Sequence, residues 1–327
     1  MRVLRYALLA FLVLAACEKG PKKKYKPQSL GALNTIAVVM DNSLWEGAVG
    51  DKIREHFAAP QIGLTWDEPR FSLEHMPPSV FTGTTRHRRA VLYVARDSVT
   101  GAQVQDDPYA TPQKMGVFMG SSDSALIATI NTHADQIMDS IRGMEIAEAQ
   151  NRFFRSLSKE TVLPDKFGVS LRLPSVYKVG KQEDNFVWID REIQKGSMNI
   201  VAYEMPGNSF NNDSALVGDI VRMRDSIGQR FIPGPDVPDK ITYMGTEKAF
   251  APSVFHTRIA GMEAIEVRGI WEVVNYPMAG PFLTYIISDP ARNRKMVLEG
   301  FTFAPATNKR DYMFELEAIL KTVVFQE

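Results

Sequence analysis

The sequence has a single cysteine, no excess of charge of either sign, and few long apolar runs. One cysteine cannot form an internal disulfide, which excludes a disulfide scaffold. The 38 basic side chains balance 38 acidic ones, which argues against a nucleic-acid binder that relies on bulk positive charge. After the first sixteen residues no apolar run approaches the roughly 20 residues needed to span a bilayer. With 45% hydrophobic residues, we expect a folded, water-soluble body rather than a disordered chain.

Recognisable catalytic motifs are missing as well. The chain contains no G-x-S-x-G, H-E-x-x-H, phosphate-binding loop or G-x-G-x-x-G segment. Its five histidines fall in five separate segments, and none has a second histidine at metal-ligand spacing. The sequence therefore predicts no catalytic residues, no metal site and no cofactor, and it favours a non-enzymatic protein.

The N-terminus has the layout of a secretory signal. Arg2 and Arg5 precede an apolar run of eleven residues, 6–16, which is too short to span a bilayer. The run ends in Leu-Ala-Ala directly before Cys17, and this pattern resembles the bacterial lipobox. The resemblance implies cleavage before Cys17 and acylation of its thiol, which would anchor the protein in a lipid bilayer. An ordinary signal peptide followed by a coincidental cysteine is the alternative.

Composition and periodicity divide the chain into four parts. Residues 1–16 are the signal peptide, and residues 17–33 are the lipidated cysteine with a flexible tether rich in Lys, Pro and Gly. Residues 34–160 form a first α+β unit that ends in a long helix, which opens at Ser122. We expect an interruption of that helix at Gly143. Residues 161–327 form a second, larger α+β unit.

The predicted fold class is α+β, with a mainly antiparallel sheet and helices on one face in each unit. The element order of the second unit resembles the Mog1/PsbP-type fold. Similar short segments recur in the two halves: 49–54 is similar to 217–222, and 78–81 to 252–255. Such matches in the same order favour a tandem duplication, although chance recurrence is the alternative.

The sequence offers three candidate ligand-binding residues. Glu46 lies in the first turn of a predicted helix, where backbone N–H groups can hold an anion, although the carboxylate of Glu46 itself compensates the helix dipole. Arg86 and Arg88 would share one face of a strand and could clamp an anion, or serve as charges that protect an exposed strand edge. The spacing of Glu145 and Glu148 is that of di-metal helices, but we interpret the pair as solvent-exposed.

Several segments together resemble a known family. They are Leu44-Trp45-Glu46-Gly47 with Gly50-Asp51, Glu68-Pro69-x-Phe71, and Phe301-x-Phe303-Ala304-Pro305. With the lipobox, they resemble an uncharacterised envelope lipoprotein family of Bacteroidetes-type bacteria, domain-of-unknown-function family 4837, over nearly the whole mature chain. The resemblance implies no established activity. In such bacteria, acidic residues behind the lipidated cysteine accompany surface export. Here Glu18 precedes a lysine run, which favours the outer membrane and its periplasmic face.

The leading hypothesis is a membrane-anchored, non-catalytic envelope lipoprotein that binds a small ligand or a partner protein of the envelope, and no nucleic acid. One alternative is a periplasmic hydrolase or transferase that uses carboxylates and arginines in the cleft between the units. Another is a structural module that bridges other envelope proteins.

Overall fold

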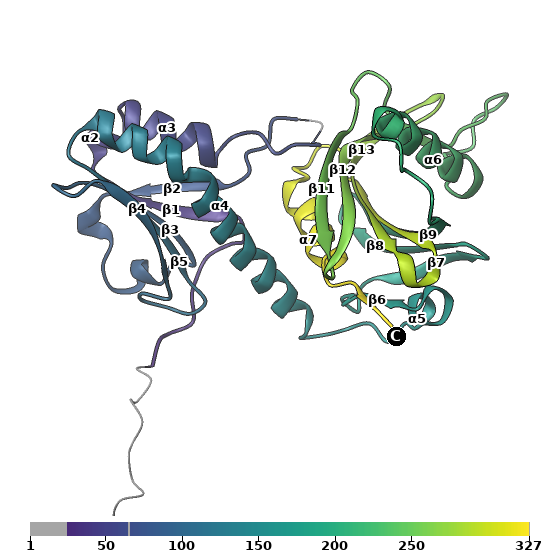
Figure 1. Cartoon of the computed structure of the whole chain (residues 1–327), viewed down its shortest axis with the longest axis horizontal. Helices are drawn as coiled ribbons and strands as arrows, with labels where there is room; N and C mark the ends of the chain where they lie inside the picture. The colour runs from purple at the N-terminus through teal and green to yellow at the C-terminus, as the bar shows by residue number, and fades with distance from the viewer. Residues whose placement is uncertain (1–24, 65, 327) are drawn as a thin grey trace, which may run out of the picture.

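The structure, a computed structural model, describes residues 25–64 and 66–326. The predicted signal peptide and Cys17 lie outside the described residues. Two units lie side by side, and helix α4 runs from the first toward the second (Figure 1). None of the helices in the described part of the chain is long and apolar enough to cross a membrane. The predicted α+β class with two units is confirmed.

The first unit contains a five-stranded sheet with the order β2-β1-β3-β5-β4. Its elements are β1 (Thr35–Val39), α2 (Asn42–Trp45), α3 (Ala48–Phe57), β2 (Ser72–Met76), the 3₁₀ helices η1 (Pro78–Val80) and η2 (Gly83–His87), β3 (Ala90–Arg96), β4 (Gly101–Asp106), β5 (Lys114–Gly120) and α4 (Asp123–Phe153). Helices α3 and α4 cover one face of this sheet, where their apolar side chains meet those of the central strands.

The expectation of a mainly antiparallel sheet is wrong for this unit. Strand β1 pairs in parallel with β2 and β3, and β3 pairs in parallel with β5. Only β4 is antiparallel. Central parallel strands are buried on both faces and therefore read as continuous apolar runs. The run Thr35–Met40 has this character, because Ile36 and Val38 face the helices while Ala37 and Val39 enter a smaller cluster on the other face.

Helix α4 is continuous over 31 residues, so the interruption expected at Gly143 does not occur. The predicted start is confirmed, since the Ser122 side chain accepts a hydrogen bond from the backbone N–H of Ala125 at 3.2 Å. A single glycine inside a helix costs only about 1 kcal/mol relative to alanine. The apolar contacts along α4 outweigh that cost.

The second unit contains an eight-stranded antiparallel sheet with the order β10-β12-β13-β14-β9-β8-β7, and β11 pairs with β12. Its elements are α5 (Val162–Phe167), β6 (Val169–Ser170), β7 (Lys178–Glu183), β8 (Phe186–Ile193), β9 (Gly196–Pro206), η3 (Asp213–Ala215), α6 (Leu216–Phe231), β10 (Met244–Thr246), β11 (Ser253–Ile259), β12 (Met262–Val273), β13 (Tyr276–Asp289), η4 (Pro290–Arg292), β14 (Arg294–Phe303), α7 (Arg310–Leu320) and β15 (Val324–Phe325). The short strands β6 and β15 pair with each other.

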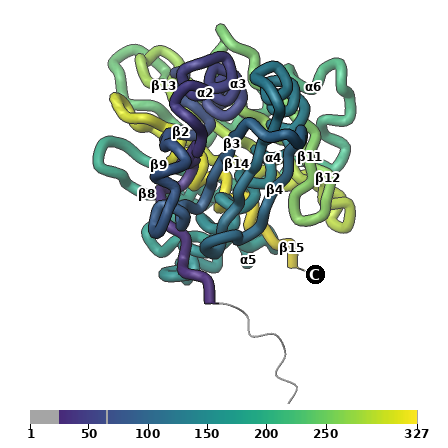
Figure 2. The backbone as a smooth tube through the Cα atoms, turned by 90° about the vertical axis from the view of Figure 1, so that its left-hand side faces the viewer, coloured from purple at the N-terminus to yellow at the C-terminus, as the bar shows by residue number. Residues whose placement is uncertain are grey.

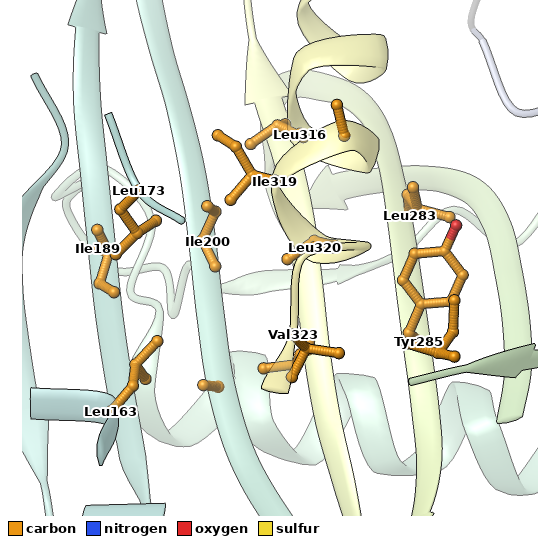
Figure 3. Packing of buried hydrophobic residues seen from close by; sticks show 14 of the residues in the cluster. Leu163, Leu173, Ile189, Ile200, Leu283, Tyr285, Leu316, Ile319, Leu320 and Val323 are labelled. Atoms are coloured by element: carbon orange, nitrogen blue, oxygen red, sulfur yellow. The ribbon is translucent and has the colours of Figure 1, made fainter. Parts of the chain in front are cut away.

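Helices lie on both faces of the second sheet, which corrects the expectation of one covered face. Successive residues of a strand point to opposite faces. Ile200 therefore packs with Leu316 and Ile319 of α7, whereas Val201 packs with Ile220 of α6. Figure 3 shows the cluster under α7, with Leu316, Ile319, Leu320 and Val323 facing the strands.

The two units do not have the same topology, which contradicts the expected duplication. One sheet is mainly parallel and the other antiparallel. Residues 78–80 form the 3₁₀ helix η1, whereas the matching residues 252–255 lead into strand β11. Residues 49–54 and 217–222 both lie in helices, α3 and α6, but these helices cover sheets of different topology, so chance recurrence of short segments explains the matches.

The end of the predicted tether lies against the first unit. Ser29 N–H donates to Thr111 O at 3.1 Å, and Leu30 N–H donates to His87 O at 2.7 Å. Ser29 is buried. Residues 27–33 are therefore part of the folded body. The described chain begins under the first unit and ends under the second, and both termini lie at the lower side of the molecule in Figures 1 and 2.

Candidate functional site

Helix α4 belongs to the cores of both units. Its first part, including Ile130 and Ile141, packs under the first sheet. Its last two turns, with Ile146, Ala149 and Phe153, join the core of the second unit. The surfaces where the units meet therefore lie along the second half of α4.

A buried ion pair lies at the middle of this junction. The Arg89 guanidinium donates through Nε to Glu145 Oε1 at 2.9 Å and through Nη2 to Oε2 at 3.2 Å. Both side chains are buried, at 2% and 0% exposure. The predicted solvent exposure of Glu145 is therefore wrong. Glu148 points elsewhere and pairs with Arg152 at 2.8 Å.

A second buried carboxylate, Glu317 of α7, accepts hydrogen bonds from three cations of the two units. Arg142 of α4 donates at 2.5 Å, Arg268 of β12 at 2.8 Å, and Lys321 at 2.8 Å. Burial alone would raise the pKa of Glu317, but the three positive charges outweigh burial and hold that pKa far below its usual range. Glu317 therefore stays ionised throughout the neutral range.

A cavity of about 560 Å³ opens where α4, α7 and the segment before β1 meet, and we call it the junction pocket. This volume is in the range of small-molecule sites. Both units contribute to its wall. The apolar lining residues are Ala32, Leu33, Ala149, Phe153, Pro174, Val176, Tyr312 and Phe314; the polar ones are Asn34, Arg152, Arg155, Ser156, Ser175, Arg191, Asp311 and Glu315.

The three arginines of the junction pocket differ in their partners. Arg191 donates to Glu315 at 2.5 Å, and Arg152 donates to Glu148, which is outside the lining. Arg155, just past the end of α4, forms no ion pair with any described residue. Its guanidinium is therefore available at the exposed rim of the pocket.

Asn34 carries a buried acceptor and lines both the junction pocket and a small cavity beside Arg142 and Glu317. Its side chain is 1% exposed, and Nδ2 donates to Asp311 Oδ1 at 3.1 Å. The other side-chain atom, Oδ1, has no hydrogen-bond partner among residues 25–64 and 66–326. A buried carbonyl oxygen without a donor is rare, because losing its hydrogen bonds to water costs about 1–3 kcal/mol. A donor from outside the chain would remove this cost.

A smaller cavity of about 330 Å³ lies nearer the middle of α4 and is lined by Arg70, Arg142, Glu266 and Arg268 among others. Several of its charges are paired: Arg268 donates to Glu266 at 2.6 Å as well as to Glu317, and Arg142 also donates to Glu317. Tyr285 donates to Glu266 at 3.0 Å, and its burial, with the nearby carboxylates, raises the pKa of Tyr285 well above its usual value. The Tyr285 hydroxyl therefore stays protonated at neutral pH.

A family described as a domain of unknown function, DUF4837, matches residues 156–322, slightly more than half of the sequence. The chain belongs to the DUF4837 family. A second domain of unknown function, DUF8532, matches residues 29–154. The family resemblance is thus confirmed for the second unit, while the motifs at 44–51 and 68–71 fall in the segment that DUF8532 matches.

No curated protein matches this DUF4837 member. Among solved structures, human StAR-related lipid transfer protein 5 is similar at 12% identity and a TM-score of 0.24, over 54% of this chain and 97% of that one. The lipid transfer and protein localization domain of human StarD13 (DLC2) is similar at 10% identity and a TM-score of 0.21, over 45% and 88%.

The structure does not bring Glu46, Arg86 and Arg88 of this DUF4837 protein together. Glu46 follows the carboxyl end of β1 and is exposed. Arg86 and Arg88 precede β3, which runs parallel to β1, so they lie at the opposite end of the sheet. They are also not on a strand, because Arg86 belongs to η2 and donates to Phe81 O at 2.9 Å, while Arg88 pairs with Glu74.

The residues of the junction pocket were not apparent from the sequence. Arg152 lies in the last turn of a helix with an apolar stripe and Arg155 just after it, positions where arginine is common on solvated surfaces. Asn34 precedes a strand, where a polar residue is ordinary. Among the described residues, no three His, Cys, Asp or Glu side chains gather into a possible metal site.

Proposed function

We propose that this protein is a lipid-anchored, non-catalytic binding protein of the bacterial envelope, and that it binds a small amphipathic ligand in the junction pocket. The observation that carries the binding role is the pocket itself, which both units build and which combines apolar walls with a few polar groups. Neither unit forms the pocket alone, so the packing of the two units around α4 is what creates the binding site.

Two strongly perturbed groups of the junction, Glu317 and Tyr285, are unsuited to general acid–base catalysis at neutral pH. A general acid or base works best when its pKa lies near the working pH. Glu317 has a pKa far below neutrality and Tyr285 one far above it, because each is buried beside charges that fix its protonation state. Groups held in this way stabilise the junction and do not exchange protons at neutral pH.

The proposed lipid anchor and the proposed location in the envelope are inferred from the sequence around Cys17. Two or three acyl chains on this residue would hold the protein stably on a membrane, where a single chain would not. The tether would place the body on the periplasmic face of the outer membrane.

Metabolic labelling tests the anchor. Labelled palmitate should enter the wild-type protein in growing cells and should not enter Cys17→Ala, which should leave the membrane fraction. An unlabelled wild-type protein, or a Cys17→Ala variant that still sediments with membranes, would overturn the lipid anchor.

Native mass spectrometry tests the pocket. The full chain, purified in a maltoside detergent, should bind one molecule of the uncharged probe methyl dodecanoate. Val176→Trp should abolish this binding, because Val176 lines the pocket and is 53% exposed, so that a larger ring fills the mouth without disturbing the core. The matched control is Val99→Trp in the first unit, where Val99 is 60% exposed. Binding that survives Val176→Trp, or none in the wild type, would refute the proposal.

A further inference from the structure

We infer that the ligand of the junction pocket is an elongated amphipathic anion, with a carboxylate at one end, an apolar middle, and an O–H or N–H donor at the other end. The inference rests on the binding function proposed above and names the chemical class of the ligand.

The anionic end is assigned by Arg155. This residue lines the pocket at its exposed rim and has no ion pair with a described residue, unlike Arg152 and Arg191, which are paired. A guanidinium offers five donors in a planar fork that matches a carboxylate. Three arginines and two carboxylates line the pocket, so the wall carries an excess of positive charge.

The donor end is assigned by Asn34. Its Oδ1 is the buried acceptor without a partner among the described residues, and Asn34 lines the pocket. The Asn34 conformation is held on both sides, since its backbone N–H donates to Glu145 Oε2 at 3.2 Å and its Nδ2 donates to Asp311. The free oxygen is therefore fixed in place before any ligand binds.

The two ends are separated along α4. Asn34 contacts Glu145, and Arg155 follows Phe153, the last residue of the helix. At 1.5 Å per residue, positions 145 to 153 of a helix span about 12 Å. Ala149 and Phe153 lie between these points and present apolar surface to the pocket. A twelve-carbon chain with polar groups at its two ends suits this layout.

A series of three probes separates the contributions of the two ends. Native mass spectrometry of the full chain compares 12-hydroxydodecanoate, dodecanoate and methyl dodecanoate. We expect dodecanoate to bind at least about tenfold more tightly than its methyl ester, because a charged hydrogen bond is worth about 1.5–3 kcal/mol. We expect the terminal hydroxyl to improve binding by a further factor of about 3 to 10, because a neutral hydrogen bond is worth about 0.5–1.5 kcal/mol.

Variants assign each effect to its residue. Arg155→Gln should remove the preference for the acids over the ester, while Arg222→Gln, an arginine of α6 that is 71% exposed, should keep it. Asn34→Gly should abolish the advantage of the hydroxyl, and glycine tolerates the positive φ of 55° at this position. The probe series on the wild-type chain needs no variant, so it holds even if Asn34→Gly fails to fold.

The outcomes separate this inference from the proposed function. If methyl dodecanoate binds and is blocked by Val176→Trp, but neither acid binds more tightly than the ester, the ligand class is wrong and the binding function stands. Equal binding of the two acids overturns the assignment of the donor to Asn34. If no probe binds, the proposed function itself is refuted.

Discussion

Both carboxylate oxygens of Glu68, in the first unit, accept hydrogen bonds from the backbone N–H of Lys309, in the second unit, at 2.8 and 2.9 Å. The backbone N–H of Arg310 also donates to Glu68, at 2.8 Å. These N–H groups begin helix α7, whose own N-cap residue, Lys309, makes no side-chain cap hydrogen bond. A loop of one unit thus caps a helix of the other, and the carboxylate also complements the positive end of the helix dipole.

Removing this cap should lower stability. We expect Glu68→Ala to reduce the free energy of unfolding by about 1–2 kcal/mol, the upper part of the range for helix caps, because Glu68 is buried. Glu68→Gln should cost less, since it keeps one acceptor. Urea unfolding measures both, with the exposed neighbour Asp67→Ala as the control. Equal effects of Glu68→Ala and Asp67→Ala would contradict the capping role.

Acid should weaken the junction through Glu317. Its pKa in the folded protein lies below the unfolded value of about 4.3, so its stabilising contribution is complete above that value and is lost as the pH falls further. The stability of the wild type should therefore decrease below about pH 4.3. Glu317→Gln should be less stable at pH 7 and should lose less on acidification. The control is Glu263→Gln, at an exposed position. Parallel pH profiles of wild type and Glu317→Gln would refute this prediction.

The buried pair Arg89–Glu145 should behave as one unit. Arg89→Met and Glu145→Gln should each cost about 3–5 kcal/mol, because each leaves a buried charge without its partner. The double variant should cost less than the sum of the two, with a coupling of about 2 kcal/mol in a double-mutant cycle. Additive costs would show that the pair does not interact.

Replacing two helical glycines by alanine should change the stability of the protein in opposite directions. A Cβ at Gly143 of α4 meets nothing within 4 Å, so Gly143→Ala should stabilise the protein by about 1 kcal/mol. A Cβ at Gly228 of α6 would lie 1.7 Å from Met244 O, so Gly228→Ala should destabilise it by pushing α6 away from β10. Thermal unfolding of both variants checks the signs. A stabilising Gly228→Ala would disprove this close approach.

Much of the local structure was predictable because it depends on neighbours in the chain. The apolar stripe with Leu126, Ile130 and Ile137 predicts the first part of α4, and all three side chains are buried. The spacing of Glu145 and Glu148 is equally local, yet it does not tell which of the two is buried. Arg89, 56 positions away, decides that.

The candidate site could not be predicted from the sequence, because it also depends on contacts between residues that are distant in the chain. The neighbouring arginines Arg88 and Arg89 have different environments. Arg88 forms an ion pair with Glu74 near the surface, whereas Arg89 is buried against Glu145. Nothing in their own segment distinguishes them, because the difference depends on how α4 crosses the sheet. The pairing of Arg191 with Glu315 likewise joins residues 124 positions apart.

Short-range patterns of apolar and polar residues predicted many of the helices and strands and the division into two α+β units, and short sequence motifs indicated the DUF4837 family. Only the tertiary structure decided that the strands of the first sheet run mainly parallel, that Glu68 of the first unit caps helix α7 of the second, and that the junction pocket exists. A cavity exists only where surfaces distant in sequence meet without filling the space between them. Its shape, and the oxygen of Asn34 left without a donor, follow from packing between the units rather than from any one segment.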